Sequence, residues 1–231
     1  MTTKNETTKK TVLMIVTSHA QLGTSGQKTG FWLEELAAPY YELVEAGFAV
    51  DIASPLGGKP PVDPKSESGA APSVTRFQGD REATAKLVAT KRLGDVTSPY
   101  DAYFVVGGHG VMWDLAESDV LAKLLGHAHD EGRVVAAVCH GPAALSSVKD
   151  ASGAPLVKGK RVAGFSNEEE DAVGLTGIVP FALETRLRDL GGLYESGPKW
   201  GSFAVCDGRL VTGQNPASSA AVAKLVIQAI A

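Results

Sequence analysis

Residues 133–142 read Arg-Val-Val-Ala-Ala-Val-Cys-His-Gly-Pro, and this stretch decides the fold. Its apolar, β-branched part is typical of a strand buried on both faces. The strand stops abruptly at Cys139. Pro142 then suits the first turn of a short helix, because the N–H groups of that turn make no helical hydrogen bond and proline, which has no N–H, loses nothing there. A reactive side chain in a tight strand-to-helix turn is a nucleophile elbow. The stretch therefore predicts an α/β enzyme whose nucleophile is Cys139.

Apolar runs of the same kind recur along the chain and alternate with helical patterns. Further strands are expected at residues 11–17, 48–53, 101–106 and 160–165, and helices at residues 32–47, 80–93, 115–130, 181–190 and 216–231. Residues 202–206 and 209–212 flank Asp207-Gly208, which predicts a small β-hairpin. Fully apolar strands separated by helices predict a three-layer α/β sandwich, with a mostly parallel sheet and helices on both faces.

Two segments are expected to be irregular. Pro39 lies within the helical pattern and predicts a kink or a break there. Residues 54–73 are rich in Pro, Gly and Ser, which predicts a long loop. In parallel sheets, ligands bind beyond the carboxyl ends of the strands. Cys139 and the run Gly107-Gly108-His109-Gly110 each follow a predicted strand, so both are expected at this edge.

The composition is that of one globular domain. The chain has 231 residues, of which 44% are hydrophobic and 21% charged, so residues 11–231 are expected to form a single domain behind a disordered tail of residues 1–10. The net charge of −4 gives no reason to expect binding to nucleic acid, and no apolar run is long enough to span a membrane. Two cysteines make no disulfide framework, which favours a cytoplasmic location.

The predicted position of Cys139 favours its thiolate. The dipole and free N–H groups at a helix N-terminus stabilise the anion. The backbone N–H groups of His140 and of Gly108, at the end of another strand, can hold an oxyanion formed on the attacked carbon. The opposing interpretation is an ordinary buried cysteine, since cysteine is among the most buried residue types. The elbow favours the nucleophile.

His140 needs a carboxylate partner to fix its tautomer. The acidic run Glu168-Glu169-Glu170-Asp171 offers candidates, although acidic residues are favourable at a helix N-terminus in any case. No histidine follows His140 in the sequence. This excludes amidotransferase-type and papain-type enzymes, whose catalytic histidine lies far downstream of the cysteine.

No metal site is expected. His127 and His129 are two residues apart on a predicted helix, so their side chains point to different faces. His109 in its glycine-rich turn is a single histidine, which is not a metal site by itself. The same turn fits neither the dinucleotide-binding nor the P-loop pattern. Cys206 lies on a predicted hairpin strand and is expected in the core.

Together these motifs resemble the ThiJ/PfpI superfamily, and they are most similar to its branch of glutathione-independent glyoxalases and heat-shock chaperones of fungi and bacteria. The matching segments span nearly the whole chain in order: Thr29-Gly30-Phe31-Trp32-Leu33-Glu34-Glu35 with Pro39-Tyr40, Gly107-Gly108-His109-Gly110 with Met112-Trp113-Asp114, Ala137-Val138-Cys139-His140-Gly141-Pro142, Gly164-Phe165-Ser166-Asn167-Glu168-Glu169-Glu170, and Asp207-Gly208-Arg209-Leu210-Val211-Thr212-Gly213-Gln214-Asn215-Pro216. These segments are specific for the superfamily and less specific for one activity.

The resemblance implies a flavodoxin-like sandwich and a set of site residues. The family's glutamate that hydrogen-bonds the nucleophile falls at Glu35. The third member of its catalytic triad falls at Glu170, with Glu169 as the alternative. Gly108 and His109 would bind the substrate and its oxyanion. The resemblance also implies a homodimer that needs neither cofactor nor metal.

The activity that the resemblance implies is the conversion of methylglyoxal, a small reactive dicarbonyl, and water to lactate without glutathione. Cys139 would form a hemithioacetal with the aldehyde, and Glu35 or His140 would move a proton through an enediol. Three other reactions are alternatives on the same site: protein deglycation, peptide hydrolysis and isonitrile hydration. A non-catalytic role is the remaining alternative, as a holdase chaperone or as a sensor in which Cys139 is oxidised.

Overall fold

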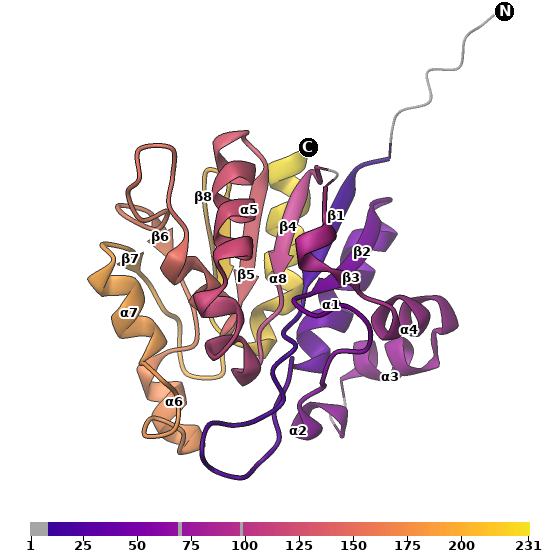
Figure 1. Ribbon diagram of the computed structural model, residues 1–231, viewed down its shortest axis with the longest axis horizontal. Helices are drawn as coiled ribbons and strands as arrows, with labels where there is room; N and C mark the ends of the chain where they lie inside the picture. The colour runs from indigo at the N-terminus through magenta and orange to yellow at the C-terminus, as the bar shows by residue number, and fades with distance from the viewer. Residues whose placement is uncertain (1–8, 69–70, 98) are drawn as a thin grey trace, which may run out of the picture.

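A seven-stranded sheet forms the centre of the protein (Figure 1) in a computed structural model that describes residues 9–68, 71–97 and 99–231. The strand order is β3-β2-β1-β4-β5-β9-β8. Neighbouring strands run parallel, except that β8 and β9 form an antiparallel hairpin. The strands are β1 (Thr11–Ile15), β2 (Ala49–Ser54), β3 (Lys91–Arg92), β4 (Ala102–Val105), β5 (Val134–Val138), β8 (Ala204–Asp207) and β9 (Leu210–Gly213). The predicted mostly parallel sheet and its hairpin are confirmed.

Helices cover both faces of this sheet, as predicted. The chain crosses the sheet in one direction from β1 to β2 and in the other from β4 to β5. Right-handed crossovers therefore put α1 and α5 on opposite faces. Helix α8 packs beside α1, and Figure 1 shows α5 in front of the sheet and α8 behind it. The helices are α1 (Leu33–Glu45), α2 (Pro64–Glu67), α3 (Pro72–Gly79), α4 (Arg81–Val88), α5 (Asp119–Asp130), α6 (Asn167–Val173), α7 (Leu183–Asp189) and α8 (Ser219–Ile230).

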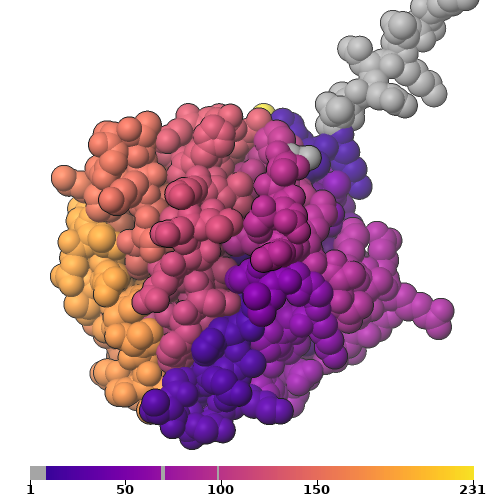
Figure 2. Space-filling model, viewed as in Figure 1, coloured from indigo at the N-terminus to yellow at the C-terminus, as the bar shows by residue number. Residues whose placement is uncertain are grey.

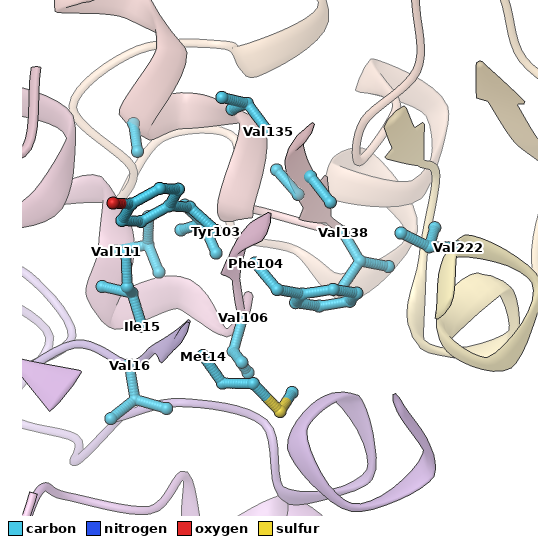
Figure 3. Packing of buried hydrophobic residues seen from close by; sticks show 14 of the residues in the cluster. Met14, Ile15, Val16, Tyr103, Phe104, Val106, Val111, Val135, Val138 and Val222 are labelled. Carbon is cyan, nitrogen blue, oxygen red and sulfur yellow. The ribbon is translucent and has the colours of Figure 1, made fainter. Parts of the chain in front are cut away.

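The hydrophobic core lies on both sides of the central strands. Successive side chains of a strand point to opposite faces. Figure 3 shows Met14 and Phe104 on one side, near Val222 of α8, and Ile15 and Tyr103 on the other. All five side chains are buried. Since burying one such side chain contributes roughly 1.5–3 kcal/mol, the packed strands give a rigid base for the loops at their ends.

The loops that follow β1, β4 and β5 meet at the carboxyl edge of the sheet. The direction of strand order reverses between β1 and β4, and such a switch point is where ligands bind in open parallel sheets. The loop after β1 reaches across this edge, where Gly23 lies against Ile178 and Trp113. Figure 2 shows this indigo segment projecting beside the orange region that contains α6 and α7.

Pro39 does not break the first helix, so of the predicted kink or break the break is wrong. Helix α1 runs without interruption from Leu33 to Glu45. A proline inside a helix removes one backbone hydrogen bond and costs about 3 kcal/mol. The buried side chains of Leu36, Tyr40 and Leu43 pack into the core and offset this loss.

Three other segments also differ from the predictions. Residues 54–73 are not one loop, because Pro64 starts the short helix α2 and Pro72 starts α3. The helix expected at residues 80–93 ends at Val88, and β3 follows it. The strand expected at residues 160–165 is only β6 (Arg161–Val162), which pairs with β7 (Leu193–Tyr194) in a separate two-stranded sheet. For β3 and β6, pairing with a strand distant in sequence decides the local structure.

The N-terminal segment lies only partly within the described residues. The expected tail of residues 1–10 falls mostly outside the described residues, and the Lys10 ammonium forms an ion pair with Asp101. Among residues 9–68, 71–97 and 99–231, no helix combines the length and apolar character needed to cross a bilayer.

Candidate active site

Cys139 lies in a strained turn at the end of β5. Its φ of 60° is in the left-handed region, which costs a residue with a side chain roughly 1–3 kcal/mol. Two backbone hydrogen bonds hold the turn: the Cys139 N–H donates to the Gly213 carbonyl, and the Phe165 N–H donates to the Cys139 carbonyl. The 3-10 helix η4 (Gly141–Ser147) follows directly. The chain thus has the strand, cysteine and helix of an elbow.

His140 connects Cys139 to Glu170. The Cys139 Sγ lies 3.4 Å from Nδ1 of His140, and Nε2 of the same ring lies 2.8 Å from Oε2 of Glu170. Both His140 and Glu170 are buried. The ring of Phe165 packs on His140 with centroids 4.4 Å apart. The structure therefore brings together the cysteine, histidine and acid that the sequence singled out.

His109 binds the other oxygen of the same carboxylate. Its Nε2 lies 2.9 Å from Oε1 of Glu170, and its ring centroid is 4.0 Å from that of His140. The glycine-rich turn after β4 places it there, in the short 3-10 helix η2 (His109–Met112). Sequence analysis placed His109 near the substrate but gave it no protein partner, because residues 109 and 170 are far apart in the chain.

The charges of this group follow from its burial and its hydrogen bonds. Burial lowers the pKa of His140 to about 4, so this ring is neutral at neutral pH. Burial alone would raise the pKa of Glu170, but its contacts with His140 and His109 outweigh that effect and lower it. An ionised Glu170 accepts, so both rings donate Nε2–H to it. The Nδ1 atom of His140 is then an acceptor that faces the Cys139 thiol.

Glu35 lies on the opposite side of Cys139 and is fully buried in α1. Both of its carboxyl oxygens lack a partner of normal hydrogen-bond geometry among the described residues, although the Cys139 thiol and the Gly107 N–H lie near enough to act against the effect of burial on its pKa. Gly107 admits this carboxyl: a Cβ at that position would lie 2.4 Å from Oε2 of Glu35 and 2.9 Å from the Cβ of Cys139. Burial raises the pKa of Glu35 well above its usual range, so the carboxyl is protonated at neutral pH.

The environment of Cys139 differs from the one predicted. Burial, followed by the charge of an ionised Glu35, raises the pKa of the Cys139 thiol well above its usual value. The backbone N–H groups of Gly108 and His140 point toward the sulfur and act in the opposite direction. The prediction of a thiolate favoured by a helix N-terminus was therefore incomplete. A thiolate here requires that Glu35 hold a proton.

Gly108 is fitted to its place beside the sulfur. Its φ is 98°, and a Cβ at this position would lie 2.5 Å from the Gly30 carbonyl oxygen and 2.6 Å from the Trp32 nitrogen. Only a residue without a side chain can follow this path. The bare backbone keeps the Gly108 N–H close to Cys139, as an oxyanion donor requires.

Glu169 has a different environment from Glu170. It completes the capping box of α6 with Ser166, and its Oε1 accepts from the Trp200 backbone N–H and from the side-chain amides of Gln214 and Asn215. It makes no hydrogen bond to His140 in the part of the chain described. Asn215 lay in a segment that carried the resemblance, but nothing in the sequence indicated a role for Trp200, which is half-exposed at a φ of 64°.

A cavity of about 340 Å³ opens in front of Cys139. Its floor is formed by the polar groups already described. Its remaining walls are largely apolar and come from four parts of the chain: Trp32 and Glu34, Phe165 and Val173, Trp200, and Asn215-Pro216-Ala217. Burial raises the pKa of Glu34 from its usual value. A small electrophile can thus approach the sulfur past apolar walls.

The structure also assembles a set of side chains that could hold a metal ion. The Nε2 atoms of His109 and His140 and a carboxylate oxygen of Glu170 all lie within 4.8 Å of one another. The sequence prediction of no metal site set aside His127 and His129 and treated His109 as a single histidine. It could not foresee a cluster whose members are 31 and 30 residues apart.

Comparison with known families and proteins gives consistent results. Residues 28–229 match the model of the DJ-1/PfpI family. The chain is 33% identical to Glyoxalase 3 of Candida albicans over 94% of its length and 97% of the relative's. It is 30% identical to a glutathione-independent glyoxalase of Saccharomyces cerevisiae, with 96% and 98% of the two chains covered.

Solved structures show the same similarity. The Rapid Encystment Protein 24 KDa of Francisella tularensis has a TM-score of 0.92 at 39% identity, covering 96% of this chain and 99% of the other. Glyoxalase III of Candida albicans has a TM-score of 0.86 at 31% identity, with 95% and 97% covered. DJ-1beta of Drosophila melanogaster, at 19% identity and a TM-score of 0.64 over 96% and 91%, shares the fold.

Proposed function

Because this chain belongs to the DJ-1/PfpI family and matches its glutathione-independent glyoxalases over nearly its whole length, we propose that it converts methylglyoxal and water to lactate. One observation carries the proposal. The Cys139 sulfur lies at the floor of a small cavity, between a buried carboxyl that favours its proton and a neutral imidazole that can accept one. The reaction is an internal redox exchange between two carbons of one substrate, so it needs no external oxidant.

In the first step of the proposed mechanism, the Cys139 thiolate attacks the aldehyde carbon. His140 Nδ1 accepts the thiol proton, and the new oxyanion lies near the N–H groups of Gly108 and His140. Glu35 then donates its proton to this oxygen and gives a neutral hemithioacetal. Glu170 is a positioning residue here, because it holds His140 in the tautomer that leaves Nδ1 free.

In the second step, the Glu35 carboxylate removes the proton of the former aldehyde carbon and forms an enediol. The proton on His140 passes to the neighbouring carbon, which was the ketone, and the hydroxyl proton of the hemithioacetal shifts to the oxygen on that carbon. The product is a lactoyl thioester on Cys139, and the carboxyl of Glu35 is again protonated. Water hydrolyses the thioester, releases lactate and restores the thiol. His109 contributes by fixing the second oxygen of Glu170.

The test is lactate formation from methylglyoxal in the presence of a chelator and without glutathione. Cys139→Ala and His140→Ala should each reduce turnover to background. Cys206→Ala is the matched control, because Cys206 is the other free cysteine and lies half-buried on the hairpin, away from the cavity. It should keep normal turnover. Equal turnover in the Cys139 and Cys206 variants would contradict the proposal.

Protein deglycation, peptide hydrolysis and isonitrile hydration would use the same catalytic groups, so the choice of substrate distinguishes them. A panel of a glycated peptide, an unmodified peptide and an isonitrile, tested beside methylglyoxal, distinguishes deglycation, hydrolysis and hydration. A holdase would suppress aggregation equally well after Cys139→Ala. An oxidation sensor would gain oxygen atoms on the Cys139 sulfur on exposure to peroxide and would not turn over methylglyoxal.

We retain two further proposals from the sequence analysis. The first is a homodimer, which follows from the resemblance and which light scattering of the purified protein would detect or exclude. The second is a cytoplasmic location, which follows from the cysteine content and is tested by fractionation of the source cells.

A further inference from the structure

His109, His140 and Glu170 form a convergent group on one wall of the cavity. Both imidazole rings direct Nε2 to the same carboxylate, at 2.9 Å and 2.8 Å. Two imidazole nitrogens and one carboxylate oxygen are also the protein ligands of a common class of zinc site that leaves a fourth position open. The same three side chains therefore form a hydrogen-bonded cluster and offer a ligand set.

The charge of this region favours a cation. Glu170 and Glu169 are adjacent buried acids. Among the described residues, the Glu170 carboxylate accepts hydrogen bonds from the two histidines, and Glu169 accepts only from neutral donors. No lysine or arginine in the described ranges forms an ion pair with either carboxylate. Two adjacent buried carboxyl groups that no described lysine or arginine pairs with favour a divalent ion.

Zinc binding would require only small shifts of the two imidazole nitrogens and the carboxylate oxygen. Tetrahedral zinc with Zn–N distances of about 2.0–2.1 Å holds its nitrogen ligands roughly 3.3 Å apart. The three ligand atoms now lie within 4.8 Å of one another, so the two nitrogens need to approach by no more than about 1.5 Å, and each nitrogen must move about 0.4–0.5 Å away from the carboxylate oxygen that it contacts at 2.9 or 2.8 Å. His109 is partly exposed and lines the cavity, which gives an ion a route from solvent.

We propose that His109, His140 and Glu170 bind one Zn²⁺ ion and that this binding switches off the Cys139 site. Zinc takes the Nε2 lone pair of His140, so the proton of this neutral ring moves from Nε2 to Nδ1. Nδ1 then faces the Cys139 sulfur as a donor and can no longer accept the thiol proton. No proton is gained or lost by the ring. Metal binding and base function are therefore mutually exclusive on His140.

A rival zinc site must be distinguished from this one. The Cys139 sulfur and Nδ1 of His140, at 3.4 Å, could themselves chelate zinc on the other side of the ring. The two sites share His140 but differ in their other ligands. Replacing Cys139 removes the rival site and leaves the proposed one intact.

The test uses the Cys139→Ser/Cys206→Ser variant, which has no thiol. Titration with zinc chloride against a chromophoric chelator should show one bound ion per chain. Adding His109→Gln or Glu170→Gln should weaken binding at least about tenfold, since loss of even an outer contact costs this much. His127→Gln is the matched control. It removes an exposed histidine that pairs with Glu131 on the surface, and binding should not change.

Cobalt reports the ligands directly. Co²⁺ in the thiol-free variant should give the intense visible bands of a tetrahedral nitrogen and oxygen site, and wild type should show no thiolate-to-cobalt charge-transfer band. Loss of binding in the thiol-free variant, or full binding in both ligand variants, would overturn the proposal. Circular dichroism establishes that each variant is folded. Because these readouts are binding and spectra, they do not depend on which reaction Cys139 performs.

Discussion

Two buried glutamates lie on either side of the Cys139–His140 pair, and the protein holds them in opposite states. Glu35 has no partner of normal hydrogen-bond geometry among the described residues, and its pKa is raised. Glu170 is buried almost as fully but accepts from two histidines, and its pKa is lowered. Burial alone would protonate both. The hydrogen-bond donors around each carboxyl group, and not the extent of its burial, decide its protonation. The protonated Glu35 can therefore donate a proton, whereas the ionised Glu170 can only orient His140.

The largest effect on turnover is expected from replacing Glu35, the acid that donates a proton. Glu35→Gln keeps the shape but removes the transferable proton, so kcat should fall about 10²–10⁴-fold with little change in KM. Steady-state kinetics with methylglyoxal measures both constants. A kcat within tenfold of wild type would show that Glu35 is only a packing residue.

The second prediction concerns the sign of the stability change. Glu35→Met removes an unpaired buried polar group and should raise the free energy of unfolding by roughly 1–3 kcal/mol. Glu170→Met leaves the Nε2–H donors of His140 and His109 without a partner and should lower it by roughly 2–6 kcal/mol, at about 1–3 kcal/mol for each donor. Urea unfolding at neutral pH measures both. Changes of the same sign in the two variants would break the comparison.

His140 and Glu35 should also have opposite effects on how the free energy of unfolding changes with pH. The unfolded chain protonates His140 near its usual pKa of 6.5, but the folded chain does so only near pH 4. Stability should therefore fall by roughly 3 kcal/mol as the pH drops from 6.5 to 4. The raised pKa of Glu35 has the reverse effect, because stability is lost as the pH rises above its usual value of 4.5.

Unfolding curves across this range separate the two contributions. His140→Asn should flatten the loss between pH 6.5 and 4.5, above the window in which Glu170 titrates. Glu35→Gln should remove the loss at higher pH. Between pH 4.5 and 6.5, where the two effects oppose each other, it should steepen the fall in stability on acidification. An unaltered acid slope in the His140 variant would show that this ring is not held neutral.

The smallest effect on catalysis is expected from Trp200, which lies in the wall of the cavity and outside both buried acid sites. Trp200 contributes an apolar wall and contacts no group of the Cys139–His140–Glu170 cluster by hydrogen bond in the described chain. Trp200→Gly relieves a left-handed backbone but removes the wall, so KM should rise no more than about tenfold while kcat stays the same. Trp200→Phe, which keeps the aromatic wall, is the control. A fall in kcat would place Trp200 among the reacting groups.

Much of this architecture could be predicted from local sequence patterns. The run ending at Cys139 required a buried strand and a sharp turn, and both are present because five apolar residues fit only the interior of a sheet. Asp207-Gly208 likewise predicted the hairpin. The pattern failed at β6, where Arg161–Val162 pairs with a segment near residue 193 instead of joining the main sheet.

The chemistry of the site could be predicted only in part. Resemblance pointed to Glu35 and Glu170, and the structure brings both next to the Cys139–His140 pair. Their opposite protonation could not be inferred from sequence, because it depends on burial and on His109, a residue far from either acid in the chain. For the same reason the cluster of two histidines and Glu170 was missed.

The most direct measurement of the central claim is the covalent intermediate on Cys139. Wild-type protein mixed with methylglyoxal and quenched rapidly in acid is digested and analysed by mass spectrometry. The account predicts an adduct of one methylglyoxal molecule on the peptide that contains Cys139, at a level that follows lactate production and disappears in Cys139→Ser. Lactate formed at the normal rate with no adduct on this peptide, or with the adduct on Cys206, would contradict it.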